Sequence, residues 1–427
     1  MVDVILAGGT VLTGEGIQET DIRIADGRIA EIGPGLTGDE TIDCTGYWVG
    51  PGLVDLHAHF REPGLEWKED IATGSRAAAA GGYTAVVVMP NTDPVTDSGH
   101  VARYVATRGD EVGLVDVIPA GAVTKGRAGH ELAHLDELWA AGVRVFSDDG
   151  DVVGDAGLLR RAMDYLAARG GVISQHAVDV GLSRGGHMHE GSVSSLLGMY
   201  GIPAAADDVI IGRDLRLVEM TGAGYHVQHL STAGGVAMIA EAKAKGLPVT
   251  AEVTPHHLAF DHHAAAGTDP VYKMMPPLRS TEDRDALRQG LEDGTIDVVG
   301  TDHAPHAEHE EEVPWEQAPN GVIGLEWAAA VVNTFAGLDQ EAFFDRLSIA
   351  PARIGQIADQ GLVPTVGDVA NLMAFDPTTE WTPESTVSKA RNSPYFGMVL
   401  RGKPMVTIHR GVVTARDGVS ERGGTAA

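Results

Sequence analysis

The chain has 427 residues, of which 43% are hydrophobic, enough for one large core and a smaller accessory domain. Its 60 acidic residues against 31 basic ones give a formal net charge of −29, which argues against partners such as nucleic acid or anionic membranes. The sequence has no apolar run of about 18 residues and no basic-then-apolar N-terminus, so neither a transmembrane helix nor a signal peptide is predicted.

The acidic charge is spread along the chain, and only 7 of the 31 basic residues are lysines. This pattern favours a halophilic protein, since counter-ions in a salt-rich cytoplasm screen its self-repulsion. An ordinary acidic enzyme is the alternative. The single cysteine, Cys44, cannot form an internal disulfide or a thiolate metal cluster, which favours a reducing cytoplasm. We expect Cys44 to be a small buried residue.

The first 50 residues read as short strands separated by glycine turns. The C-terminal 65 residues have the same character. Together they predict one small, β-sandwich-like domain built from residues 1–51 and 362–427. The strands expected in it are Val4–Leu6, Thr10–Leu12, Asp21–Ile24, Arg28–Ile32, Ala370–Phe375, Met398–Leu400 and Met405–Ile408.

Residues 52–361 alternate apolar strand candidates with alanine-rich helical runs such as Gly74–Ala80, Glu131–Ala141 and Leu158–Arg169. Eight such units in about 300 residues predict a closed (β/α)8 barrel of the α/β class. An open doubly wound sheet would place a glycine-rich turn after its first strand, whereas histidines stand there. The predicted strands are Leu53–His59, Thr84–Met89, Asp116–Ala120, Val143–Ser147, Val172–Gln175, Tyr225–His229, Pro248–Val253 and Ile296–Gly300.

The carboxyl ends of barrel strands converge on one mouth, where catalytic groups gather. Imidazoles and carboxylates stand at most of these ends. In chain order they are His57 and His59, Asp148 and Asp149, His176, His229, His256 and His257 after the seventh strand, and Asp302. Because alternate residues of a strand point to one side, His57 and His59 can reach the same ion. The set predicts a catalytic divalent metal site, since a structural zinc would normally be closed by cysteines.

The number of ligands favours two ions. His57, His59 and Asp302 would hold one, and His176 and His229 the other. Asp149 could bridge them, although spacing alone does not decide between Asp148 and Asp149. Two ions about 3.5–4 Å apart can share a hydroxide and lower its pKa toward neutrality. Asp302 would then take a proton from the nucleophile and deliver it to a leaving nitrogen.

Two polar residues near the metal histidines predict how a substrate is held. Arg61 follows His59 by two residues, and its guanidinium can grip a substrate carboxylate with two hydrogen bonds. Asn91 stands at the end of the second strand and can add another hydrogen bond. A surface salt bridge for Arg61 and a turn position for Asn91 are the alternatives.

Several motifs together resemble the class I dihydroorotases of the amidohydrolase superfamily, essentially from end to end. They are GLVDLHAHFREPG at 52–64, EWKED at 66–70, TGSRAAAAGG at 73–82, MPNT at 89–92, FSDDG at 146–150, TPHHL at 254–258, PPLR at 276–279 and GTDHAPH at 300–306. The resemblance implies reversible hydrolysis of dihydroorotate to N-carbamoyl-aspartate, used in pyrimidine biosynthesis in the ring-closing direction. The expected partner is this small molecule, with a homodimer as a reasonable assembly.

The resemblance also implies site residues. The zinc ligands would be His57, His59, Asp149, His176, His229 and Asp302, with one or two Zn2+ ions per chain and two favoured. It thereby selects Asp149 over Asp148 as the bridge. The substrate would contact His59, Arg61, Asn91, His306, Asn320 and Gly321.

The sequence departs from the family at two positions near the substrate. Met275 stands where the family usually has Asn before Pro-Pro-Leu-Arg, and Asn320-Gly321 replaces a frequent Phe-Gly. Methionine forms no strong hydrogen bond, so we expect that contact to be lost or supplied by Asn320.

Two other functions compete with dihydroorotase. One is another cyclic amidase, such as an allantoinase or hydantoinase, whose metals are typically bridged by a carboxylated lysine near the fourth strand. The nearest lysine here, Lys125, lies in the preceding loop. The other is an inactive scaffold subunit, which the complete ligand set disfavours.

Overall fold

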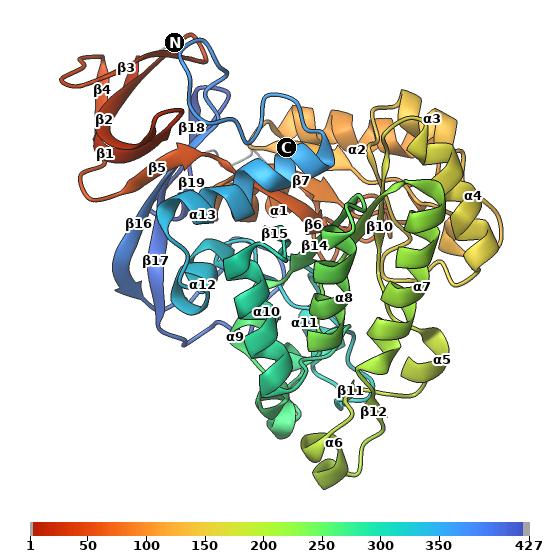
Figure 1. The fold of residues 1–427 in the computed structure, drawn as a ribbon. Helices are drawn as coiled ribbons and strands as arrows, with labels where there is room; N and C mark the ends of the chain where they lie inside the picture. The colour runs from red at the N-terminus through yellow and green to blue at the C-terminus, as the bar shows by residue number, and fades with distance from the viewer. Residues whose placement is uncertain (1–2, 422–427) are drawn as a thin grey trace.

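The computed structural model describes residues 3–421 and divides into a barrel and a sheet (Figure 1). The strands β6 and β7 are buried along their whole length, which is the pattern of parallel strands covered on both faces. The barrel strands are β6 (Leu53–Ala58), β7 (Tyr83–Val88), β8 (Asp116–Pro119), β9 (Val145–Phe146), β10 (Val172–Gln175), β13 (Gly224–Val227), β14 (Val249–Val253) and β15 (Val298–Val299).

Parallel pairing runs around the whole barrel. Regular ladders join β6 to β7 to β8, and β9 through β10, β13 and β14 to β15. Isolated parallel bridges close the two gaps, one between Gly121 and Phe146 and one between Ala58 and His303. The predicted (β/α)8 barrel is therefore confirmed, and each of its eight expected strands coincides with a strand of the structure.

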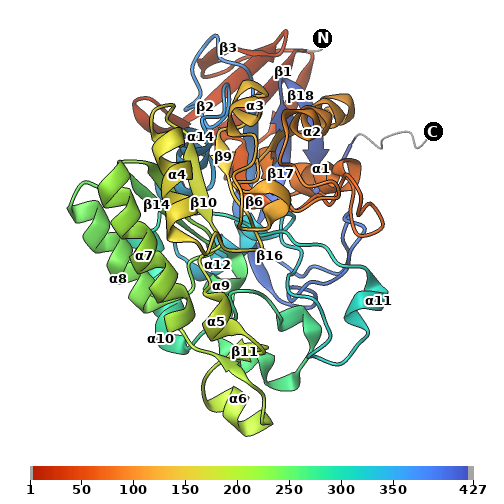
Figure 2. The ribbon, with the colours of Figure 1, turned by 90° about the vertical axis from the view of Figure 1, so that its right-hand side faces the viewer.

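Helices cover the outside of the barrel (Figures 1 and 2). Several begin at side-chain caps, including Asp70 on α1 and Asp155 on α4. The helix expected over Glu131–Ala141 starts later, at Leu135, because Leu132 forms an antiparallel bridge with Thr124. The main helices are α1 (Ile71–Ala80), α2 (Gly99–Val112), α3 (Leu135–Ala140), α4 (Ala156–Ala167), α7 (Ala205–Thr221), α8 (Ala233–Ala244), α10 (Thr281–Asp293) and α12 (Ala328–Phe335).

Short elements fill the connections between barrel strands and helices. An excursion between β10 and α7 protrudes from one end of the barrel (Figure 2) and contains α5 (Val180–Ser183), β11 (Met188–His189), α6 (Ser192–Leu197) and β12 (Gly201–Ile202). The others are η1 (Lys125–Arg127), α9 (Pro255–Ala259), η2 (His262–Gly267), η3 (Pro270–Tyr272), α11 (Glu308–Glu311), α13 (Gln340–Phe344), η4 (Asp345–Ile349) and α14 (Ala350–Gly355). No described helix has the length and apolar character needed to cross a bilayer.

Strands from both chain ends form a nine-stranded sheet around a separate apolar core that includes the buried Cys44. This arrangement confirms the predicted small β domain, while its boundaries at 51/52 and 361/362 stay a prediction. The strands are β1 (Val4–Thr13), β2 (Gly16–Ala25), β3 (Arg28–Gly33), β4 (Glu40–Asp43), β5 (Trp48–Pro51), β16 (Leu372–Trp381), β17 (Leu400–His409), β18 (Val412–Arg416) and β19 (Val419–Ser420).

Two expectations for this sheet were wrong in detail. Val4–Leu6 and Thr10–Leu12 belong to one strand, because the glycines between them form a bulge and do not end the strand; Gly8 has a φ of 71° there. Met398 and Val399 lie outside β17, since only Leu400 of that group pairs with β16.

Candidate active site

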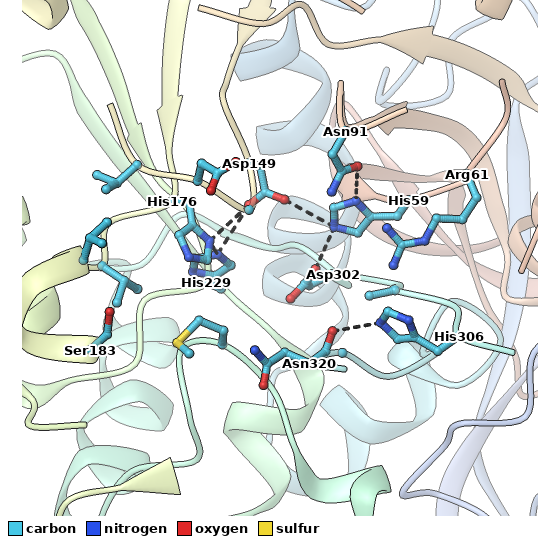
Figure 3. Close-up of a pocket in the computed structure, with 18 residues that line it drawn as sticks. His59, Arg61, Asn91, Asp149, His176, Ser183, His229, Asp302, His306 and Asn320 are labelled. Atoms are coloured by element: carbon cyan, nitrogen blue, oxygen red, sulfur yellow. Dashed lines mark hydrogen bonds and ion pairs between the residues drawn. The ribbon is translucent and has the colours of Figure 1, made fainter. Parts of the chain in front are cut away.

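Residues at the carboxyl ends of the barrel strands enclose a cavity of about 370 Å³ (Figure 3). All the sequence-predicted substrate residues line it, and so do most of the predicted metal ligands. The lining comprises His59, Arg61, Asn91, Asp149, Gly150, Asp151, Val152, His176, Val178, Val180, Ser183, His229, Met275, Asp302, Ala304, His306, Asn320 and Gly321. His57 is fully buried beneath this layer.

One group of predicted ligands combines the first barrel strand with the last. His57 Nε2 lies 3.4 Å from Asp302 Oδ1, and His59 Nε2 lies 3.1 Å from the same oxygen. The two imidazoles face one point because they are alternate residues at the end of β6. Asp302 reaches that point because β15 is the neighbour of β6 on closing the barrel.

Asp149 stands between this group and a second pair of imidazoles. Its Oδ2 lies 3.5 Å from His57 Nε2 and 3.4 Å from His59 Nε2. Its Oδ1 lies 3.3 Å from His176 Nδ1 and 3.6 Å from His229 Nε2. Each carboxylate oxygen therefore faces one histidine pair, as Figure 3 shows for the labelled residues.

The neighbouring Asp148 points away from the cavity. Its Oδ1 accepts hydrogen bonds from the backbone N–H groups of Val123 and Thr124, at 2.8 and 2.9 Å, and its Oδ2 accepts one from the Thr124 hydroxyl. Both of its carboxylate oxygens hold the β8–η1 connection. Of the two aspartates that spacing left open, only Asp149 faces the imidazoles.

The side chains present fit a bound cation. His57 Nε2 and Asp149 Oδ1 are buried and have no hydrogen-bond partner within residues 3–421. Unpartnered buried polar atoms are costly, and a divalent cation would satisfy both of these. Ligand atoms of His57, His59 and Asp149, and of Asp149, His176 and His229, lie within 4.8 Å of one another in each group. The donor set of imidazole and carboxylate suits zinc and similar metals.

Electrostatics keeps the acidic members of the site ionised. Burial alone would raise the pKa of Asp302, but electrostatic attraction to His57 and the contact with His59 Nε2 outweigh burial and lower it. The same competition lowers the pKa of Asp149, with His57, His176 and His229 opposing the effect of burial. Both aspartates are therefore anionic at neutral pH.

Three site residues have unusual backbone geometry. Arg61, His229 and Asp302 have φ values of 62°, 33° and 47°, in the left-handed region that residues with a side chain rarely adopt. Such strain costs on the order of 1–3 kcal/mol per residue and persists where the surrounding structure enforces it. Three of the ten such residues in the described chain line the cavity, where side-chain placement outweighs local backbone preference.

The other side of the cavity is polar and partly positive. Arg61 is buried, and its Nε donates a 3.2 Å hydrogen bond to the Pro305 carbonyl. Burial lowers the pKa of Arg61 to about 10, so it keeps its charge at neutral pH. No carboxylate of the described chain lies within 4.0 Å of its guanidinium, which excludes the surface salt bridge as its role. Asn91 accepts a 2.9 Å hydrogen bond from His59 Nδ1 through its Oδ1.

His306 is held in one tautomer. Its Nε2 donates to the Asn320 carbonyl at 2.9 Å, so Nδ1 is the acceptor and faces Lys68 Nζ at 3.4 Å. Burial and the positive charges of Arg61 and Lys68 lower the pKa of His306 to about 3. His306 is consequently a neutral hydrogen-bonding group beside the charged Arg61.

The two departures from the family pattern both lie on the cavity wall. Met275 and Asn320 line the same cavity, and the Asn320 side chain is exposed. The amide of Asn320 makes no hydrogen bond to the described chain, which leaves it available to a ligand. By contrast His257 is engaged with the Pro276 carbonyl, at 3.1 Å, and neither His256 nor His257 lines the cavity.

Sequence reasoning missed two charged residues next to the site. Lys68 bridges His306 and Glu310, whose Oε1 lies 2.8 Å from its Nζ. Glu252 is fully buried and contacts His57 Nδ1 through its Oε1 at 2.5 Å. A glutamate between apolar residues of a predicted buried strand was a usable signal for Glu252. Lys68 carried no comparable signal, because a lysine in a loop is ordinarily solvated.

The chain is similar in sequence to proteins of one kind. A family model described as "Dihydro-orotase-like" matches residues 46–234. A "Dihydroorotase" of Pelotomaculum thermopropionicum is 46% identical over 97% of this chain and 99% of its own length. A "Dihydroorotase" of Mycobacterium tuberculosis has the same identity and coverage.

Solved structures with a similar fold carry a different name. The L-hydantoinase (dihydropyrimidinase) of Arthrobacter aurescens has a TM-score of 0.88 and 27% identity, and covers 99% of this chain and 98% of its own. The D-hydantoinase (dihydropyrimidinase) of a Thermus species has a TM-score of 0.81 and 26% identity, over 99% and 97% of the two chains.

Proposed function

Because the chain belongs to the dihydroorotase family, we propose that it catalyses the reversible hydrolysis of (S)-dihydroorotate to N-carbamoyl-L-aspartate in pyrimidine biosynthesis. One observation carries the proposal: a carboxylate that bridges two histidine pairs shares a cavity with a buried arginine that has no protein carboxylate to pair with. The first feature suits a hydrolytic metal centre, and the second suits an anionic substrate.

The metal cofactor would be two Zn2+ ions per chain. His57, His59, Asp149 and Asp302 would hold one and Asp149, His176 and His229 the other. Cations held there would supply Lewis acidity, which lowers the pKa of a coordinated water and polarises a carbonyl. The geometry supports this assignment through the two ligand groups that meet at Asp149.

Asp302 would move the proton. In the ring-opening direction, water adds to the ring carbonyl carbon, the carbon–nitrogen bond breaks, and the ring nitrogen leaves as part of the carbamoyl group. Asp302 accepts the proton of the attacking water and gives it to that nitrogen. Its lowered pKa supports the first half of this role, because the carboxylate is free to accept at neutral pH. Ring closure runs the same steps backward and releases water.

The remaining cavity residues would orient the substrate. Arg61 would bind the carboxylate, aided by Asn91 and His306, while His59, Asn320 and Gly321 would contact the ring or its substituents. Asn91 is held by His59, and His306 is held by Asn320 and Lys68, so both are positioned before substrate binds. Pre-positioned donors of this kind lower the ordering cost of binding.

Hydrolysis of another cyclic amide, by an allantoinase or a hydantoinase, is the second candidate, favoured by the similarity to hydantoinase structures. The bridge argues against it. A carboxylated lysine would have to stand where Asp149 does, and Lys125 instead pairs with Glu131 at 2.7 Å on the surface. An inactive scaffold is the third candidate, and the assembled side chains around Asp149 argue against it.

The cellular setting is also proposed from sequence. The single buried Cys44 and the dispersed acidic charge support a reducing, salt-rich cytoplasm, and a homodimer is the proposed assembly.

Steady-state kinetics tests the proposed function. The purified protein is assayed at high salt with dihydroorotate and carbamoyl-aspartate. Allantoin and hydantoin are assayed separately as alternative substrates. We expect turnover of the first pair in both directions and its loss on treatment with a chelator. Faster turnover of allantoin or hydantoin than of dihydroorotate would transfer the assignment to the second candidate.

A further inference from the structure

Glu252, in the middle of β14, contacts a predicted ligand of each of the two cation positions. We propose that Glu252 is a positioning residue that fixes His57 and His229 together and so tunes cation binding at both positions. The inference rests on the proposed metal centre. Three sets of contacts carry it, together with the charge balance of a fully buried carboxylate.

The first contact sets the tautomer of His57. His57 Nε2 faces Asp149 and Asp302, so this nitrogen must keep its lone pair if it is to bind a cation. The proton then resides on Nδ1, which donates to Glu252 Oε1 at 2.5 Å. A carboxylate behind a metal-binding imidazole fixes the ring orientation and raises its basicity.

The second contact orients His229 through its backbone. The N–H of His229 donates to the same oxygen, Glu252 Oε1, at 3.1 Å. His229 has a φ of 33°, a conformation that needs support from its surroundings. The hydrogen bond to Glu252 supplies part of that support and aims the imidazole at Asp149. One oxygen atom thus holds a ligand from each group.

The third contact fixes Glu252 itself. Its Oε2 accepts from His226 Nε2 at 3.1 Å, and His226 Nδ1 lies 2.8 Å from Thr250 Oγ1. Gly300 leaves space for this carboxylate, because a Cβ at that position would lie 2.5 Å from Oε2. The side chain is therefore locked on both oxygens, which a residue that positions others requires.

The charge of Glu252 has no basic side chain to balance it. Within residues 3–421 no lysine or arginine forms a salt bridge with it, and its ion pairs are to His57 and His226 alone. A buried carboxylate is costly without compensating charge. Divalent cations beyond His57 would balance this anion.

A purely structural role is the competing explanation, since Glu252 also ties β13 to β14. The two explanations differ in what Glu252→Gln changes. If Glu252 only holds strands together, the variant lowers the melting temperature and leaves cation affinity unaltered. If Glu252 positions the ligands, the loss of charge and of the fixed tautomer weakens cation binding even where the fold is intact.

The experiment measures cation affinity directly. Zn2+ and Co2+ are titrated into metal-free protein against a chromophoric chelator, with the Co2+ absorption spectrum as a reporter of ligand geometry. Glu326→Gln is the control, because Glu326 is a half-buried carboxylate just before α12 that contacts Thr386 and Val387 and no imidazole. Far-UV circular dichroism establishes that each variant is folded.

We expect Glu252→Gln to weaken binding at both positions by about 10- to 100-fold and to alter the Co2+ spectrum, with Glu326→Gln close to wild type. Should Glu252→Gln fail to fold, Glu252→Asp and Gly300→Ala displace the carboxylate while keeping its charge, and the same weakening is expected. Wild-type affinity in a folded variant, or weakening at one position only, would overturn the inference. A wild-type protein that binds no cation would instead overturn the proposed metal centre.

Discussion

The two halves of the cavity are built differently. The half that would bind metal consists of residues at the ends of barrel strands, and each imidazole there has neighbours from an adjacent strand. The half that would bind substrate consists of Arg61, His306 and Asn320, which stand on loops after those strands. Both departures from the family pattern, Met275 and Asn320, fall in the second half.

This difference shows which requirement each half meets. Cation ligands must be placed to within a few tenths of an ångström, and strand ends tied by buried hydrogen bonds provide that accuracy. Substrate contacts sit on loops, which tolerate replacement more readily because fewer buried contacts depend on them. Substitutions in the metal half should therefore lower kcat, whereas substitutions in the substrate half should mainly change the affinity for substrate.

The largest effect is expected from Asp302→Asn. The amide cannot accept the proton of the attacking water and is a weaker ligand, so kcat should fall by at least about 1,000-fold. His59→Ala should also abolish turnover. Both are measured by steady-state kinetics on dihydroorotate, with circular dichroism to verify folding. Full activity of folded Asp302→Asn would refute the proton-transfer role.

A smaller effect, on recognition, is expected from Arg61→Met. Loss of a charge-assisted pair of hydrogen bonds to the substrate carboxylate should lower kcat/KM by about 100-fold, mainly through KM. Arg216→Met is the control, because Arg216 pairs with Glu219 on the surface, at 2.8 Å, far from the cavity. An unchanged KM with a reduced kcat in Arg61→Met would contradict this role, because Arg61 would then act in the catalytic step and not in substrate binding.

In the substrate half, protonation of His306 should make the free energy of unfolding depend on pH. Its pKa is lowered to about 3 by burial and by the charges of Arg61 and Lys68, against about 6.5 when unfolded. The stabilisation from neutral His306 is present above pH 6.5 and is lost as the pH falls toward 3. Between pH 6.5 and 5 it accounts for roughly 2 kcal/mol of unfolding free energy.

Urea unfolding of chelator-treated protein from pH 7 to pH 5 checks this expectation. His306→Asn should lose less stability over that interval than the wild type, by roughly 2 kcal/mol. Parallel pH dependences for the two proteins would mean that His306 is not held neutral in the folded state.

The smallest effect is expected at the departures themselves. Met275→Asn should add one hydrogen bond and lower KM by about 3- to 10-fold. If Asn320 supplies the amide that Met275 cannot, the gain should be larger in an Asn320→Ala background than in the wild type. Equal gains in the two backgrounds, measured as a double-mutant cycle on KM, would show that Asn320 does not compensate.

Most of the barrel could be predicted because its strands are apolar runs that end in polar residues. The fourth and eighth strands were found although only Val145–Phe146 and Val298–Val299 keep regular pairing. The bulge in β1 could not be predicted, because a glycine pair in a strand and one in a turn look alike in sequence. The start of α3 was missed because it depends on a bridge between Thr124 and Leu132.

Most of the site could be predicted from the residues that end the barrel strands. The histidines and Asp149 stand at or within a few residues of the strand ends, so strand geometry brings them together. Glu252 was missed because its partners, His57 and His229, come from other strands and only the closed barrel reveals their contact. The choice between Asp148 and Asp149 rests on hydrogen bonds to Val123 and Thr124, which no spacing rule encodes.

Turnover should depend above all on cations held at Asp149, so metal content measured alongside turnover is the most direct test. Elemental analysis and dihydroorotate kinetics are carried out on the same preparation before chelation, after chelation and after adding Zn2+ back. We predict about two cations per chain, loss of turnover with their removal, and recovery with their return. Undiminished turnover by protein from which all metal has been removed would contradict the account.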